Sequence, residues 1–342
     1  MAVVHNADFL LASALQTLAQ AANSEVVEVA RHVAEALRSK GFEALVVSVV
    51  DDLEDLGARL KQTGAELVFN LVESLGGSTA REPEVPEFLA AHGWAFTGCG
   101  ARGLELAHDK PEAKRVLASA GILVPRGFVV RPGEGFVVPD LRYPLFVKPA
   151  EEDGSIGVDQ ASVVRAPNEL APRVQRLTDA IQGPALIEEY LPGAEINVAI
   201  VDTVEGQRSF PTTIDFSSLP KGLAPIVTYA GKWEAASPEY TIRSVAAESL
   251  LPAEVVARAE ATARAAYRAL EGRGVGRVDL RLDAEGRPNV IDVNPNPDLH
   301  PEAGLTVAAG YRGVAYADLI ESIVRFARRE ARSEKREVRN EK

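Results

Sequence analysis

The sequence predicts a mixed α/β and α+β protein in which a parallel-sheet domain comes first and regions of antiparallel sheet follow. Its 342 residues are enough for two or three domains with a large buried core. Strand-like and helix-like segments alternate over about the first 100 residues, which is typical of a parallel sheet. After residue 121 the pattern changes to short strands separated by Gly- and Pro-containing turns, which is typical of antiparallel sheet.

The elements of the first domain follow from hydrophobic spacing. Residues 25–38 carry valine and leucine at helical spacing; Asn23 and Ser24 can cap this helix, and Gly41 ends it. The other expected elements are buried strands at 44–50 and 67–71, a helix at 84–92 and a short strand at 94–97.

The second half begins after residues 98–103 with a helix at 110–120, which Gly121 stops. Short strands are expected at 127–130, 145–148, 162–164, 185–188 and 197–201. A helix at 252–271 then precedes strands at 276–282 and 289–293, which the turn at 283–286 joins. The charge-dense segment 328–342 is typical of a solvated helix end or a frayed terminus, and we assign it no function.

Composition excludes several classes of protein. A formal net charge of −12 argues against a nucleic-acid or anionic-membrane surface, because such partners require clustered Lys and Arg. The single cysteine, Cys99, cannot form an internal disulfide, which suits a reducing compartment. No apolar run approaches the roughly 20 residues of a membrane span, and the N-terminus lacks the features of a signal peptide. We therefore expect a cytoplasmic protein.

The strongest chemical signal is GRVDLRLD (276–283) followed by VIDVNPNPDL (290–299). Asp292 and Asn294 project to the same face of one strand, and Asp279 can join them if the two strands pair through their turn. Three hard oxygen donors on one face describe a Mg²⁺ site shared with phosphates. The alternative is a pair of solvated carboxylates with no function.

A second signal is YPLFVKPAEEDGSIGV (143–158), where Lys148 leaves a buried strand and a loop with Gly154, Ser155 and Gly157 follows. Glycines let backbone N–H groups approach an anion, and the ammonium adds charge, so the segment could cover phosphates. It is not the GxxxxGK[ST] loop, because its lysine precedes the glycines. A Gly-rich hairpin turn is the alternative.

A third signal is ALIEEYLPGAEINVAIV (185–201). Its hinge at Glu188–Leu191 would expose backbone groups that could read a base edge, and Glu195 could bind ribose hydroxyls. An ordinary hairpin would explain the segment equally well.

Together these segments resemble the ATP-grasp superfamily and, within it, the D-alanine–D-alanine ligase-like proteins. The resemblance extends from about residue 66 to residue 305. It also includes segments 67–100, AHDK (107–110) and TYAGKW (228–233). The six segments in this order are specific at the level of the superfamily.

The resemblance implies a role for each matched residue. Lys110 and Lys148 match lysines that hold the ATP phosphates, and Lys232 matches a lysine on a mobile loop that reaches the γ-phosphate. Arg277 matches the arginine that faces the acyl phosphate and the tetrahedral intermediate. The remaining matches are the phosphate flap (Gly154, Ser155, Gly157), the adenine hinge (Glu188, Leu191), the ribose acid (Glu195) and the magnesium ligands (Asp279, Asp292, Asn294).

The resemblance also implies an architecture of three lobes with ATP between the last two. The expected boundaries are 1–103, 104–190 and 191–330, followed by a charged tail at 331–342. ATP and two Mg²⁺ ions, for which Mn²⁺ could substitute, would be the cofactors. Small carboxylate and amine substrates would be the partners, and the family allows a homodimer, although nothing in the sequence establishes an interface.

The sequence departs from the true D-alanine ligases around the amino-acid site. Their HGxxGEDG-like segment reads NLVESLGGSTAREP here, and Ala303–Gly304 replaces a Ser-Leu pair that binds a substrate carboxylate. Pro297–Asp298 replaces Pro-Gly, Gly154 replaces a serine that links to the mobile loop, and Asp292 replaces a glutamate. The N-terminal acid that holds the first amino group has no clear match, and Glu25 is the candidate for it.

We interpret the chain as an ATP-dependent carboxylate–amine ligase that acts through an acyl phosphate on substrates other than two D-alanines. A genuine D-alanine–D-alanine ligase is one alternative. An ATP-binding regulatory module without turnover is an alternative from another class, and a carboxylase or phosphoryl-transfer relative is a third. Because no covalent enzyme intermediate is needed, Cys99 is expected to be a small buried residue and not a nucleophile.

Overall fold

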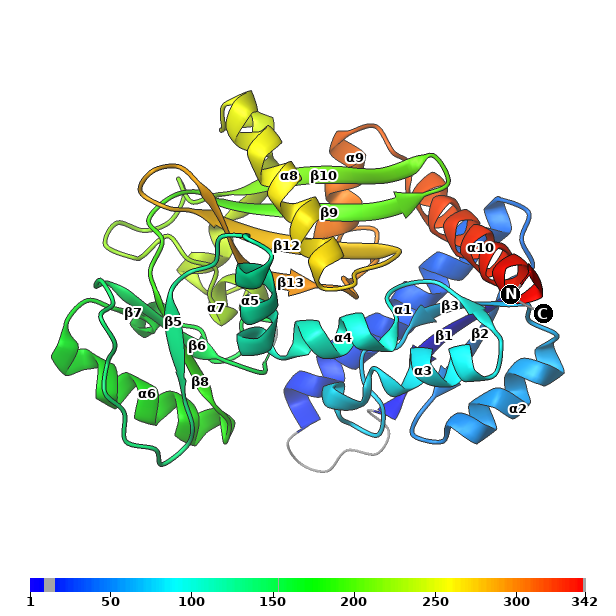
Figure 1. The fold of residues 1–342 in the computed structure, drawn as a ribbon, viewed down its shortest axis with the longest axis horizontal. Helices are drawn as coiled ribbons and strands as arrows, with labels where there is room; N and C mark the ends of the chain where they lie inside the picture. Colours follow the sequence, from blue (N-terminus) through cyan, green and yellow to red (C-terminus); the bar gives the residue numbers. More distant parts are fainter. Residues whose placement is uncertain (9–15, 153, 341–342) are drawn as a thin grey trace.

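Three β-sheets organise the computed structural model, which describes the backbone of residues 1–8, 16–152 and 154–340 and the side chains of 1–8, 26–152 and 154–333 (Figure 1). A four-stranded parallel sheet lies in the N-terminal part, a four-stranded antiparallel sheet in the middle, and a five-stranded antiparallel sheet in the C-terminal part. None of the helices in the described ranges combines the length and apolarity that a membrane crossing needs.

The N-terminal sheet has the strand order β2-β1-β3-β4, and all its pairs are parallel, as the sequence predicts. Alternate residues of its strands pack on opposite faces: Val3 contacts the core under α1 (Gln16–Ser39), whereas Val4 contacts the core under α2 and α3. The other elements are β1 (Ala2–Asn6), β2 (Leu45–Val49), α2 (Leu53–Thr63), β3 (Leu67–Leu71), α3 (Glu84–Ala91) and β4 (Ala95–Phe96).

The predicted start of the first helix is wrong. Helix α1 begins at Gln16 and runs through Asn23 and Ser24, because the preceding residues are mostly Ala, Gln and Leu, which favour helix. Strand β1 and helix α2 were not predicted. Helix α4 (Ala101–His108) was not predicted either.

The middle sheet has the strand order β5-β8-β6-β7, and every pair is antiparallel. Helix α6, which was not predicted, covers one face through Leu170, Val174 and Leu177. Helix α5 begins after Asp109, whose side chain accepts a hydrogen bond from the Glu112 backbone N–H, and this start places Lys110 at the first helical position. The bounds are α5 (Lys110–Ser119), β5 (Gly127–Val130), β6 (Leu145–Pro149), β7 (Val163–Val164), α6 (Pro167–Ile181) and β8 (Ala185–Glu189).

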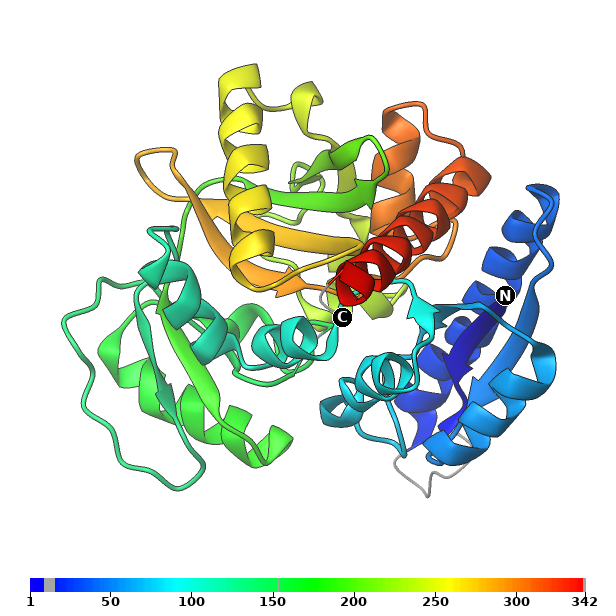
Figure 2. The ribbon, with the colours of Figure 1, turned by 45° about the vertical axis from the view of Figure 1, so that its right-hand side comes forward.

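The C-terminal sheet has the strand order β11-β10-β9-β12-β13. Helix α8 covers one of its faces, and helices α9 and α10 cover part of the other (Figure 2). Strand β9 shows the division, since Val198 packs beneath α8 and Val201 contacts the core under α10. The bounds are β9 (Glu195–Thr203), β10 (Gly206–Asp215), α7 (Tyr229–Trp233), β11 (Arg243–Ala246), α8 (Ala253–Ala269), β12 (Val275–Leu282), β13 (Pro288–Asn294), α9 (Gly304–Tyr311) and α10 (Tyr316–Asn340).

One hydrophobic core joins the N-terminal and C-terminal sheets. Phe69 of β3, Val201 of β9 and Ile320 of α10 belong to the same buried cluster, together with residues of α1. Helix α10 continues as far as Asn340, so the backbone of the predicted charged tail is helical up to that residue. The lobe boundaries themselves stay a prediction.

Candidate active site

A cavity of about 270 Å³ lies between the middle and C-terminal sheets. Its walls come from β6 and the loop that follows it, from the hinge between β8 and β9, and from β12 and β13. Every site residue that the sequence predicts, except Gly157, lines this cavity. Side chains that are up to 184 residues apart in the sequence, such as Lys110 and Asn294, therefore face one space.

The two predicted metal-binding strands pair as the sequence analysis expected. Asp279 of β12 lies directly opposite Asp292 of β13, and Arg277 lies opposite Asn294. Arg277 donates from Nε and Nη2 to the two carboxylate oxygens of Asp279, at 2.8 and 2.9 Å. Asn197 of β9, which the sequence analysis did not select, donates to Oδ1 of Asp279 at 2.8 Å. Asp279 is thus held in one orientation by two neighbours.

Three lysines lie along strand β13. Lys148 donates to the carbonyl of Ile291 at 2.9 Å, Lys114 lies 3.5 Å from the carbonyl of Val290, and Nζ of Lys110 is 4.0 Å from Oδ1 of Asp292. Desolvation in the cleft would by itself raise the pKa of Asp292, but Lys110, Lys148 and Arg277 hold it below its ordinary value. Asp292 is therefore ionised at neutral pH.

Lys114 is a site residue that the sequence analysis missed. Its Nζ lies 2.6 Å from Oε1 of Glu188, while Lys148 lies 3.4 Å from Oε2 of the same carboxylate. Burial lowers the pKa of Lys114, and the Glu188 carboxylate opposes that shift. The signal was present in the sequence, because Lys114 follows Lys110 by one helical turn and so shares its face.

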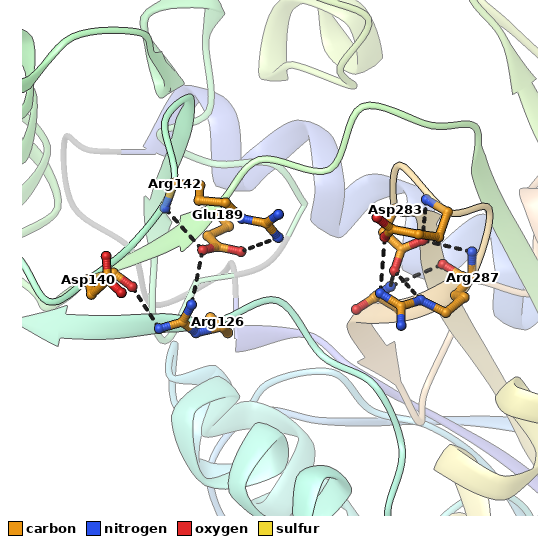
Figure 3. A network of polar contacts seen from close by, with 8 residues as sticks. Arg126, Asp140, Arg142, Glu189, Asp283 and Arg287 are labelled. Carbon is orange, nitrogen blue, oxygen red and sulfur yellow. Dashed lines mark hydrogen bonds and ion pairs between the residues drawn. The ribbon is translucent and has the colours of Figure 1, made fainter.

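Glu189, which follows Glu188 in strand β8, contacts arginines and not the lysines that surround Glu188 (Figure 3). Arg142 donates its backbone N–H to Glu189 at 3.0 Å, and the Arg126 guanidinium lies 3.5 Å away. Successive strand residues project to opposite faces, so anchoring Glu189 on these arginines leaves Glu188 directed at the lysines. The same figure shows Asp283 holding the predicted turn between β12 and β13 through Arg287.

The glycine-rich loop after β6 has the backbone conformation that glycines allow. Gly154, Ser155 and Gly157 all have positive φ, at 66°, 64° and 71°. A Cβ on Gly157 would lie 2.7 Å from the end of the Leu177 side chain, so a larger residue there would require Leu177 to shift. The loop is joined to α7, because Trp233 Nε1 donates to the carbonyl of Gly154 at 3.0 Å.

This bond offers a direct test of the loop. Trp233→Phe keeps an aromatic ring but removes the donor, so we expect ATP affinity to fall by about 3- to 10-fold, the worth of one hydrogen bond. Isothermal titration of ATP measures the effect. Trp94→Phe is the matched control, since Trp94 packs against the core under α2 and α3. An unchanged dissociation constant in Trp233→Phe would show that the contact does not support nucleotide binding.

The hinge between β8 and β9 is organised by a second missed residue, Arg281. Its Nε donates to the carbonyl of Leu191 at 2.7 Å, and its Nη1 donates to Glu195 at 2.9 Å. Burial raises the pKa of Glu195, and Arg281 opposes that rise. Arg281 could have been found from the strand period, because Arg277, Asp279 and Arg281 alternate along β12 and share one face.

The strand that carries Asn294 is tied to the N-terminal part of the chain. Asn296 donates from Nδ2 to the Val72 carbonyl at 3.0 Å and to Glu82 at 2.7 Å, while His108 lies 2.9 Å from Glu82. Asp8 holds the loop that follows β3, since it accepts hydrogen bonds from Ser74 and Gly77 of that loop. It also accepts one from Asn6 at the end of β1. The side chain of Glu25 lies outside the described residues.

The residues present fit a divalent cation that is shared with phosphates. Asp279, Asp292 and Asn294 offer carboxylate and amide oxygens, which Mg²⁺ prefers. In the described ranges no group of three or more His, Cys, Asp or Glu side chains is placed to hold a metal. Such an ion would therefore depend on the Asn294 amide and on oxygens from outside the protein. Cys99 is buried, as predicted, and burial raises its pKa to about 11.

Comparisons with known proteins agree on one family. Residues 134–325 match the family described as "D-ala D-ala ligase C-terminus". A D-alanine–D-alanine ligase of Gluconobacter oxydans is 31% identical over 86% of this chain and 91% of its own length. An uncharacterized protein of Sinorhizobium fredii, y4sG, is 32% identical over 77% of this chain and 75% of its own.

A solved structure shows the same fold. The D-alanine–D-alanine ligase of Bacillus anthracis, complexed with ATP, superposes with a TM-score of 0.72 at 21% identity. The match covers 97% of this chain and 98% of that one. The predicted fold class, mixed α/β and α+β with one parallel and two antiparallel sheets, is confirmed.

Proposed function

Because the chain belongs to the D-alanine–D-alanine ligase family and is an ATP-dependent carbon–nitrogen ligase, we propose that it joins a small carboxylic acid or amino acid to an amine and that its substrates are not two D-alanines. The proposal rests on one observation. The lysines Lys110 and Lys148, the carboxylates Asp279 and Asp292, and the hinge acid Glu195 line a single cavity. In such a set the lysines can offset phosphate charge, the aspartates can hold a divalent cation beside the phosphates, and Glu195 can accept hydrogen bonds from ribose hydroxyls.

The proposed chemistry has two steps. An oxygen of the substrate carboxylate attacks the γ-phosphorus of ATP, the bond to the β-phosphate oxygen breaks, and ADP leaves with an acyl phosphate formed on the substrate. The amine then attacks the acyl carbon, inorganic phosphate leaves, and the nitrogen loses a proton to give the amide. Lys110, Lys148 and Lys232 would stabilise the charge on phosphoryl oxygens in the first step.

Arg277 would act in the second step. Its guanidinium pairs with Asp279, one of the proposed metal ligands, so it could stabilise the oxyanion that develops on the acyl carbon. Asp279, Asp292 and Asn294 would hold Mg²⁺, for which we propose two ions, with Mn²⁺ able to substitute. When bound, these ions neutralise phosphate charge.

Part of the cavity lining supports the proposed difference in substrates. It includes small, apolar or hydroxyl-bearing residues: Ala199, Thr212, Ile214, Ser244, Gly304 and Ala308. Ala303 stands where related ligases have a serine that binds a substrate carboxylate. Loss of that charge-assisted hydrogen bond would weaken such a substrate by about 1.5–3 kcal/mol. Genuine D-alanine ligation stays the alternative.

The decisive experiment is a screen of acid and amine pairs, with Mg-ATP, that measures both ADP release and the mass of any conjugate. D-Alanine alone is one arm of the screen. We expect ADP release that requires both an acid and an amine, a conjugate of the corresponding mass, and little stimulation by D-alanine. Asp292→Asn protein controls for contaminating ATPases.

Two outcomes would contradict the proposal. D-Alanyl-D-alanine formed at a rate above that of every other pair would identify a genuine D-alanine ligase. ATP binding without stimulation by any pair would favour a regulatory module. A homodimer stays a prediction.

A further inference from the structure

Arg281 occupies a position on β12 that connects the cavity to three other segments. The residue is 5% exposed, and its side chain lies on the same face as Arg277 and Asp279, whereas Val278 and Leu280 face the core under α8. Besides Leu191 and Glu195, it donates from Nη2 to the Tyr190 hydroxyl at 3.0 Å and to the Pro225 carbonyl at 2.6 Å. One guanidinium therefore joins the hinge, the start of β9 and the segment that leads to α7.

The geometry requires arginine. The guanidinium is planar and has five N–H donors, so it can reach four acceptors at once, whereas the ammonium of lysine is a single point. The plane also lies over the ring of Tyr190, with Cζ 5.0 Å from the ring centroid. Of these partners, Tyr190, Leu191 and Glu195 line the cavity.

The ion pair between Arg281 and Glu195 determines which oxygen of Glu195 is available to a bound nucleotide. Nη1 of Arg281 donates to Oε2 of Glu195, and no residue of the described ranges donates to Oε1. Glu195 is 9% exposed and lines the cavity. A carboxylate this deeply buried needs a charged partner to remain in place as an acceptor. Arg281 satisfies one oxygen and leaves the other available.

We propose that Arg281 is a positioning residue that makes the nucleotide site select ribonucleotides, because it holds Glu195 with one oxygen available to the ribose hydroxyls. This inference rests on the proposed function, in which Glu195 binds the ribose. Arg281 itself does not touch the reacting atoms. Its effect appears as a difference between nucleotides that have and lack these hydroxyls.

The test is equilibrium binding of ATP and of 2′,3′-dideoxy-ATP to the full chain. We expect the wild type to prefer ATP by about tenfold or more, the range for a charge-assisted hydrogen bond. Arg281→Met and Glu195→Gln should each reduce this preference to about twofold or less, and the double variant should show no further loss. Arg287→Met is the matched control, because Arg287 lies in the same hairpin but is exposed and pairs with Asp283 (Figure 3).

Three outcomes would overturn the inference. Arg281→Met could weaken both nucleotides equally and keep the preference, which would mean that Arg281 serves only the hinge. Glu195→Gln could keep the preference, a result that stands even if Arg281→Met does not fold. If the wild type bound neither nucleotide, the proposed function would be contradicted as well. If only the role of Arg281 were wrong, the wild type would still release ADP in the substrate screen.

Discussion

Asp292→Ala is expected to reduce turnover by at least about 10²–10³-fold, the loss seen when one group that stabilises transition-state charge is removed. Asp292 is the carboxylate that lies opposite Asp279 and within 4.0 Å of Lys110. Its removal takes one negative charge away from the neighbourhood of Lys110, Lys148 and Arg277. ATP should therefore bind at least as tightly as before, while the chemical step fails.

Three measurements test this expectation: steady-state ADP release for turnover, titration with ATP for binding, and thermal unfolding for stability. Because Asp292 is half-buried and lines the cavity, the melting temperature should stay close to that of the wild type. Asp215→Asn is a suitable control, since Asp215 lies at the end of β10, where it accepts a hydrogen bond from the Ser217 backbone N–H. A kcat like that of the wild type in Asp292→Ala would contradict the metal assignment.

Lys148→Ala is expected to weaken ATP binding by about 10- to 100-fold, the range for loss of a charge-assisted hydrogen bond to phosphate. In the structure Lys148 lies between the Ile291 carbonyl and Glu188, in the row of lysines along β13. Glu188 would keep Lys114 as its partner after the change, so the hinge should stay in place.

A comparison of nucleotides shows which part of ATP Lys148 serves. Loss of affinity should be larger for ATP than for adenosine if the lysine contacts phosphate. Lys61→Ala, an exposed lysine on α2, provides the control. An unchanged ATP dissociation constant in Lys148→Ala would remove Lys148 from the phosphate site.

Local patterns in the sequence predicted much of the candidate site because they act over short distances. Strand alternation placed Asp292 and Asn294 on one face, and the turn at Asp283 paired their strand with that of Asp279. The same rule could have found Arg281, and helical spacing could have found Lys114. The start of α1 was wrong because capping residues within a longer helix-favouring segment do not end the helix.

Contacts between distant segments could not be predicted in the same way. Lys148 and Ile291 are 143 residues apart, and Arg281 and Leu191 are 90 residues apart. The partners of these side chains depend on the strand order β9-β12-β13 and on how this sheet faces β6 and β8. The hydrogen bond from Trp233 to Gly154 is likewise accepted by a backbone carbonyl. Every residue has such a carbonyl, so the sequence does not indicate which one Trp233 contacts.

The amino-acid sequence by itself determined the fold class and the residue types of the nucleotide site, since hydrophobic periodicity and strand alternation are properties of neighbouring residues. Only the tertiary structure decided which charges share partners: Glu188 between two lysines, Asp279 between Arg277 and Asn197, and Glu195 with Arg281. The physical reason is that a buried charge is stabilised by whichever opposite charge the packing of the sheets brings within hydrogen-bonding distance, and the packing involves the whole chain.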